Sequence, residues 1–115
     1  MSRAIEAAEE LLEHLRGLGI AAVDDVRDVA GNLPCVLIGP PVVRYDVLGG
    51  PTFVWSLVAL ASSSPGSKHA WQQCDALLDQ LDAALPLERA DPRTYPLPAL
   101  GPDPLPCYVA TYTGS

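Results

Sequence analysis

The sequence is short of basic residues, long apolar runs and cysteines. Seven Lys and Arg residues against fourteen Asp and Glu residues give a net charge of −7. This charge disfavours non-specific binding to nucleic acids or anionic membranes, because both favour a basic surface. The longest largely apolar run, residues 53–61, is about half of the roughly 18 residues that a membrane span needs. Arg3 is followed by an acidic amphipathic stretch unlike a signal peptide, so we expect a soluble domain made inside the cell.

The three cysteines, Cys35, Cys74 and Cys107, are an odd number with wide spacing. A disulfide scaffold normally has an even count, so the pattern favours reduced thiols in a cytosolic setting. Each cysteine has apolar neighbours, and a free cysteine in such surroundings usually behaves as a small buried hydrophobic residue. No CxxC or HxxxH spacing is present, and we therefore predict no metal site and no cofactor.

The remaining composition is that of one globular domain. The chain has 115 residues, of which 49% are hydrophobic and 18% are charged. A domain of this length buries roughly 65% of the surface that the unfolded chain exposes, enough for a core without disulfides. We predict a single domain over residues 1–115.

Two segments have apolar residues at the helical period of 3.6. The first, residues 2–18, begins at the potential cap Ser2, and Gly17 and Gly19 provide its stop. Its expected buried stripe consists of Ile5, Ala8, Leu12, Leu15 and Leu18, with Leu11 beside it.

The second helical segment, residues 68–85, follows the potential cap Ser67 and ends at Pro86. Its expected buried stripe consists of Trp71, Cys74, Leu78, Leu81 and Leu85, with Leu77 alongside. Asp75, Asp79 and Asp82 mark the expected solvent side.

Four segments have the character of strands. Residues 35–38 are apolar, residues 42–46 alternate after the interruption by Pro40 and Pro41, and residues 53–61 give the strongest signal. That strand is apolar on both faces apart from Ser56, so we expect it to be central, with a second helix or a neighbouring subunit on its second face. Residues 107–113 alternate as a final strand.

The intervening segments are less regular. Residues 20–32 fit a short strand or a turn of helix equally well, and residues 47–51 are expected to form a loop or hairpin connection. The proline-rich stretch 91–107 excludes a helix and a regular central strand, and we expect at most a short edge strand at residues 94–97. Together these elements predict an α+β fold, a small and mostly antiparallel sheet with two amphipathic helices on one face.

Candidate catalytic groups are sparse. The three aspartates of the second helix and His14 are each explained by a solvated helix face. A nucleophilic pair of His69 and Cys74 would need a thiol with a lowered pKa, whereas Cys74 lies on the apolar stripe. No GxGxxG, P-loop, GxSxG or HExxH motif is present. We predict no catalytic, metal-binding or cofactor-binding residues.

The aromatic residues of two strands are the more unusual feature. Phe53 and Trp55 lie on the central strand, and Tyr108 and Tyr112 share one side of the last strand. Because tyrosine and tryptophan are enriched at protein interfaces, we name these four as candidate subunit-interface residues; a role confined to the core explains them equally well.

A family resemblance rests on residues 32–41 (NLPCVLIGPP), 45–46 (YD), 48–50 (LGG) and 54–57 (VWSL). With the order of helices and strands, these resemble the tail terminator proteins, also called minor tail or tail-completion proteins, of long-tailed phages that infect actinobacteria. The resemblance implies an α/β sandwich that forms a hexameric ring and caps the tail tube. Such a ring ends tube polymerisation and docks the head-completion (stopper) proteins at the head-tail junction of the virion, after assembly in the host cytoplasm. DNA would only pass through its lumen, and no membrane is involved.

Composition is consistent with such a ring, since an acidic channel repels the DNA backbone and lets the duplex slide. Three alternatives stay open. A head-closure protein of the same neck is the nearest one, and gene neighbourhood beside the major tail protein would distinguish it. A small ligand-binding regulatory α+β domain would be dimeric and stabilised by its ligand. An enzyme would require a pocket that joins His69 to Cys74 or to the aspartates.

Overall fold

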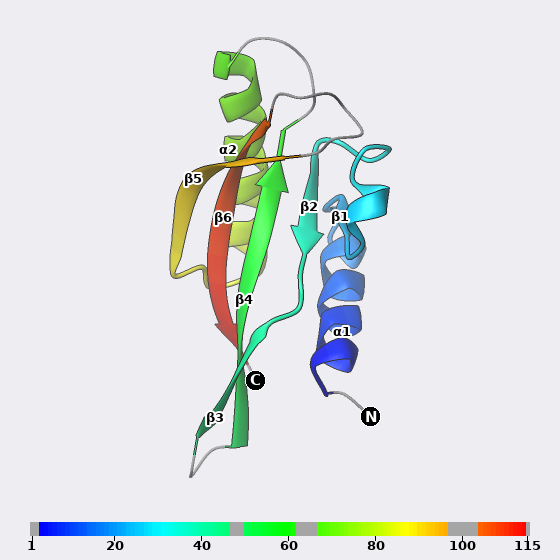
Figure 1. Cartoon of the computed structure of the whole chain (residues 1–115), viewed down its shortest axis with the longest axis vertical. Coiled ribbons are helices and arrows are strands. Elements are labelled where there is room, and N and C mark those ends of the chain that lie inside the picture. Colours follow the sequence, from blue (N-terminus) through cyan, green and yellow to red (C-terminus); the bar gives the residue numbers. More distant parts are fainter. Residues whose placement is uncertain (1–2, 47–49, 62–66, 97–103, 115) are drawn as a thin grey trace.

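A computed structural model of the chain describes residues 3–46, 50–61, 67–96 and 104–114. These residues form an α+β fold with two α-helices and one mixed sheet of six strands, as predicted (Figure 1). The elements in chain order are α1 (Arg3–Gly17), β1 (Ala22–Val23), the 3-10 helix η1 (Val26–Asp28), β2 (Cys35–Ile38), β3 (Val42–Asp46), β4 (Gly50–Leu60), α2 (Ser67–Ala84), β5 (Arg89–Tyr95) and β6 (Leu105–Gly114).

The sheet is mostly antiparallel, which confirms the prediction. Its strand order is β1-β2-β4-β6-β5, and β3 pairs with β4 outside this path. Among the described strands the β1–β2 pair is parallel, whereas β4 is antiparallel to β2, β3 and β6, and β5 is antiparallel to β6. β4 is therefore the central strand, as its apolar sequence predicts.

β2 and β3 follow one another along the same edge of β4. Ile38 of β2 pairs with Leu57, and Val42 of β3 pairs with Val54, so that residues 39–41 stand opposite only two residues of β4. The two prolines in this stretch lack the N–H group that a ladder hydrogen bond needs, and the break confirms what we predict from them. Because the side-chain period is 2, the one extra residue changes which positions face the helices.

α1 ends where glycine permits a left-handed backbone. Gly19 has φ +82°, the N–H of Ile20 donates to the carbonyl of Leu15 at 3.1 Å, and the N–H of Gly19 donates to the carbonyl of Arg16 at 3.0 Å. This pattern is a Schellman cap, in which two otherwise unpaired carbonyls of the last turn are satisfied. The side chains of Leu15 and Ile20 are both buried beside it.

The stripe predicted for α1 is only partly buried. Leu12 and Leu15 are in the core, whereas Ile5 is 62% and Leu18 is 55% exposed, so the prediction was wrong for these two. Leu18 lies one residue beyond the end of the helix. Ile5 lies in the first turn, beside residues 39–40 at the end of β2.

α2 follows its predicted pattern more closely. Cys74, Leu77, Leu81 and Leu85 are buried, Trp71 and Leu78 are half-buried, and all three aspartates are exposed. Both helices pack on the same face of the sheet. The core between them consists of Leu12, Leu15, Ile20, Ala22, Val36, Ile38, Phe53, Trp55, Leu57, Ala59, Leu77, Leu81, Leu85 and Ala110.

The second face of the sheet is only partly covered. Val29, Leu33 and Tyr95 pack over one end of it, on a second cluster that includes Cys35 and Cys107. No α-helix among the described residues covers the rest, so of the two covers expected from sequence the structure provides no second helix, and a neighbouring subunit stays a prediction. What remains is a row of half-buried side chains on β4 and β6, with Ser56 exposed. We call this row the open strip; its members are Val54, Ser56, Val58, Val109, Thr111 and Thr113.

Three segments correct the boundaries expected from sequence. Residues 20–32 contain both a short strand and a turn of 3-10 helix. β4 begins at Gly50, inside the expected loop 47–51, of which residues 47–49 lie outside the described part of the chain. β5 covers Arg89–Tyr95 and so starts earlier than the expected 94–97. Pro92 is tolerated because β5 is an edge strand.

Candidate functional site

The cysteines are core residues, as predicted. All three are free and buried, and the thiol of Cys74 lies 3.5 Å from the carbonyl oxygen of Ala59. Burial raises the pKa of Cys35 and of Cys107 to about 11. The pKa of Cys74 is also raised, chiefly by burial. At neutral pH these thiols stay protonated, so they do not provide a reactive nucleophile.

The residues that a nucleophilic or metal site would need are not brought together. His69 is exposed, and its Nε2 lies 3.3 Å from the side-chain nitrogen of Gln73, whereas Cys74 points into the core. Across the described ranges, no group of three or more His, Cys, Asp or Glu residues is placed to hold a metal ion. His14, the other histidine, lies at a different place, beside a groove.

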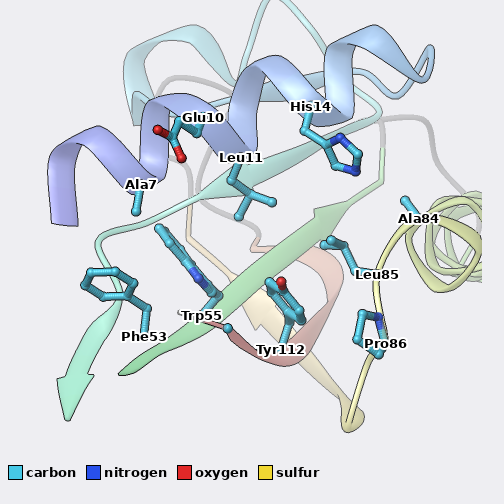
Figure 2. A pocket seen from close by; sticks show the side chains of 11 residues that line it. Ala7, Glu10, Leu11, His14, Phe53, Trp55, Ala84, Leu85, Pro86 and Tyr112 are labelled. Carbon is cyan, nitrogen blue, oxygen red and sulfur yellow. The ribbon is translucent and has the colours of Figure 1, made fainter. Parts of the chain in front are cut away.

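That groove lies between the two helices, on the helix-covered face of the sheet, and has a volume of about 360 Å³ (Figure 2). α1 forms one wall, and the end of α2 with the residues after it forms the other. β4 and β6 form the floor. The lining residues are Ala7, Glu10, Leu11, His14, Phe53, Trp55, Ala84, Leu85, Pro86, Tyr112 and Gly114.

The floor of the groove is aromatic. The rings of Phe53 and Trp55 lie 6.0 Å apart, tilted by 54°, and Tyr112 pairs with Trp55 across the β4–β6 ladder. Phe53 and Trp55 are only 6% and 3% exposed. The Tyr112 side chain leans along its strand toward Gly114: its hydroxyl oxygen lies 2.7 Å from the position that a Cβ on Gly114 would take. Glycine thus leaves room for this ring in the groove.

Two titratable groups stand at the rim. Glu10 and His14 lie one helical turn apart on α1, and both are exposed (Figure 2). Glu10 has no hydrogen-bond or ion-pair partner among the described residues. The groove therefore combines an aromatic floor with a free carboxylate at its edge. Such a combination is suited to a cation, since ring faces and a carboxylate both attract positive charge.

The structure places three of the four candidate interface residues together. Phe53, Trp55 and Tyr112 line the groove, whereas Tyr108 packs edge-on against Trp71 at a ring distance of 5.5 Å. Whether they contact another subunit stays a prediction. The sequence did not indicate the contribution of Glu10. Its only signal is its place among the polar residues of α1, where a rim residue and a solvated residue are indistinguishable.

A second unusual surface lies at one end of the molecule. The β4–β6 ladder ends with Phe53 opposite Gly114, and residues 50–52 pair with β3 alone. We call β3 with residues 50–52 the β3 arm; Figure 1 shows it extending past the end of β6. Val42 and Tyr45 on this arm are 63% and 83% exposed. The two side chains lie on opposite faces of the arm, and large apolar side chains exposed on one short segment are typical of interaction surfaces.

Comparison with protein-family models, with curated proteins and with solved structures gives no match for this chain. Neither helix in the described part of the chain is long and apolar enough to cross a membrane. Function is therefore inferred from the groove, the β3 arm and the open strip.

Proposed function

We propose that this protein is not an enzyme but a structural virion subunit, which assembles with copies of itself into a ring and acts as the tail terminator of a long-tailed phage. The observation that carries the proposal is the β3 arm, which places Val42 and Tyr45 in solvent. Covering such side chains is favourable by roughly 25 cal/mol per Å² of apolar surface. A neighbouring subunit supplies that cover in an assembly.

A closed ring requires two different surfaces on each subunit, because its contacts are head-to-tail. This chain offers more than one candidate. The β3 arm lies at one end, the groove lies on the helix-covered face, and the open strip lies on the opposite face of the sheet. Different surfaces of this kind support a heterologous contact better than a two-fold one.

The charge of the chain supports the proposed position at the end of a tail tube. Each subunit has a net charge of −7, so a ring of six has a strongly acidic character. DNA that passes through an acidic lumen is repelled by its wall and does not adhere to it. In this proposal the ring caps the tube, ends its polymerisation and presents its other face to the head-completion proteins.

The mass of the purified protein tests this proposal. We expect native mass spectrometry to find a species of six times 12.2 kDa, and negative-stain imaging to show rings, in solution or on the ends of purified tail tubes. A protein that stays monomeric at high concentration and does not bind tube ends would contradict the proposal. Tubes that lack the protein and grow to uncontrolled length provide the functional control.

One observation favours a second candidate, a small ligand-binding regulatory domain. The groove is concave and aromatic, and its volume lies within the range of roughly 300–1,000 Å³ that is usual for ligand sites. Under this alternative the protein would be a dimer, and a small molecule would raise its melting temperature by an amount that grows with the logarithm of the ligand concentration above Kd. Screening a library of small cations by thermal shift, together with the mass measurement, separates the two candidates.

A further inference from the structure

We propose that the groove between α1 and α2 receives Arg44 and Val42 from the β3 arm of a second copy of the chain. The proposal rests on the self-assembly proposed above and specifies the contact that makes it. The guanidinium of Arg44 would lie over the aromatic floor and pair with Glu10, while Val42 would cover the apolar wall of α1.

The donor surface is built by the alternation of β3. Val42 and Arg44 are two residues apart and therefore lie on the same face of the strand. Both are exposed. Because residues 50–52 pair with β3 alone, the arm stands clear of β6, and this face is accessible to another molecule. Tyr45 points to the other face of the arm and stays available for a further contact.

Arg44 also differs from the other arginines in having no partner. In the part of the chain that the structure describes, its side chain makes no hydrogen bond or ion pair. The other described arginine side chains do have partners, which are the carbonyl of Ala22 for Arg16, Asp25 for Arg27, Asp91 for Arg89 and the carbonyl of Pro92 for Arg93. An unpaired guanidinium beside an exposed Val42 is typical of an interface that a partner completes.

The acceptor surface matches this donor in size, shape and charge. A volume of about 360 Å³ is at the low end for ligand sites and suits one or two side chains. Tyr112, which is half-buried, supplies aromatic surface for a cation, and Glu10 supplies the opposite charge at the rim.

The two surfaces are distinct parts of one subunit, so each copy can give its arm to one neighbour and take the arm of another, which is a head-to-tail contact; two copies that exchange arms reciprocally would instead form a two-fold dimer. Phe53 marks the boundary between them, since it ends the β4–β6 ladder and also lines the groove. A chain of such contacts either closes into a ring or grows as a filament. The interface candidates Phe53, Trp55 and Tyr112 then contribute to assembly as the floor on which the incoming side chains rest.

A charge-swap experiment tests the contact. We expect Glu10→Arg and Arg44→Glu each to weaken self-association at least about tenfold, measured by sedimentation velocity, because each places like charges together. The double variant restores the opposite charges in trans and should recover association to within about threefold of the wild type. Glu13→Arg, the matched control on the exposed side of α1 outside the groove, makes the same change of charge as Glu10→Arg and should not weaken association. Circular dichroism checks that each variant is folded.

The outcomes separate this contact from the proposed function. If the wild type forms rings and both single variants assemble like it, the contact is wrong and the ring stands. If the swap recovers association but the complex is a two-fold dimer, the contact stands and the ring is wrong. A folded double variant that stays as weak as the single variants also overturns the contact.

Cross-linking provides a second readout that does not depend on affinity. A mixture of Glu10→Cys and Arg44→Cys chains should form an intermolecular disulfide under mild oxidation, because the two positions would face each other across the contact. The native cysteines are buried and do not compete. A mixture of Glu13→Cys and Arg44→Cys should give much less product, and equal yields in the two mixtures would overturn the proposal.

Discussion

At the scale of single residues, burial separates side chains that the sequence cannot tell apart. Ile5 and Leu12 occupy the same predicted stripe, yet Ile5 is 62% and Leu12 is 8% exposed. The two residues differ in their place along the sheet: Ile5 lies in the first turn, at the end of β2 beside residues 39–40, whereas Leu12 belongs to the core cluster. Helical period identifies a face, but only the length of the opposing strands decides how much of that face is covered.

Substitutions on α2 test this distinction. Leu81 is fully buried between the helix and the sheet, so Leu81→Ala should lower the free energy of unfolding by about 2–5 kcal/mol through lost burial and the cavity left behind. Asp79→Ala, two residues away on the exposed side, should change it by less than about 0.5 kcal/mol and leave assembly intact. Urea unfolding followed by tryptophan fluorescence measures both. A large loss from Asp79→Ala would show that this carboxylate has a structural or functional role.

At the scale of elements, the spacing of apolar residues and the positions of prolines predict the helices and strands that are buried in the core. Both helices and the central strand follow from apolar spacing, and the break before β3 follows from Pro40 and Pro41. β5 is the instructive miss. Four of its seven residues are charged or proline, because an edge strand is stabilised mainly by its ladder with a neighbour, here β6, and less by burial. Such a strand leaves no apolar pattern in the sequence.

The groove was beyond sequence analysis for a related reason. Its aromatic floor includes Trp55 and Tyr112, which the sequence already marks as candidate interface residues, and the alternation of the two strands brings them onto one face. Its rim could not, because the position of Glu10 over that floor depends on the packing angle of α1 on the sheet. Sequence also could not predict that Arg44 lacks a hydrogen-bond or ion-pair partner among the described residues, because this depends on which side chains lie near the β3 arm.

The short 3-10 helix η1 provides a pH-dependent element. Asp25 caps it by accepting from the backbone N–H of Arg27 at 2.9 Å, and its carboxylate also pairs with the Arg27 side chain at 2.7 Å. The side-chain hydrogen bonds from Arg27, followed by the backbone one, lower the pKa of Asp25 from 3.8 to about 2. We expect carboxyl NMR titration to give this value, and Arg27→Gln to return the pKa toward 3.8.

The sign of the effect on stability follows from linkage. A carboxyl whose pKa is lower in the folded chain stabilises the fold above its unfolded pKa of 3.8, and this stabilisation is lost as the pH falls toward 2. Wild type and Asp25→Asn, which keeps a capping oxygen, should therefore converge in stability in that window. A wild-type Asp25 that titrates near 3.8 would contradict the ion pair and the cap together.

At the scale of the whole molecule, shape and charge bear on assembly in opposite directions. The chain measures 49 × 26 × 25 Å, and the β3 arm lies at one end of the long axis (Figure 1). The arm offers apolar surface to a neighbour. The net charge of −7 on every copy opposes the approach of that neighbour, so assembly depends on which of the two dominates.

Ionic strength tests that balance. Two subunits of charge −7 with centres about 26 Å apart repel by several kcal/mol without salt, and the Debye length falls from about 30 Å at 0.01 M to about 8 Å at 0.15 M. The single exposed pair of Arg44 and Glu10 also weakens with salt, but such a pair contributes only about 0–1 kcal/mol. Relief of repulsion should dominate, so Kd for self-association should fall at least about tenfold between these salt concentrations in sedimentation experiments.

A charge variant distinguishes this effect from a general response to salt. Asp79→Lys changes the charge of each copy by two units at an exposed position away from the groove and the β3 arm. With less repulsion to screen, it should associate more tightly than the wild type at 0.01 M and show a shallower dependence on salt. The opposite result would be a wild-type Kd that rises steadily with salt. Specific ion pairs, and not apolar cover of the arm, would then hold the copies together.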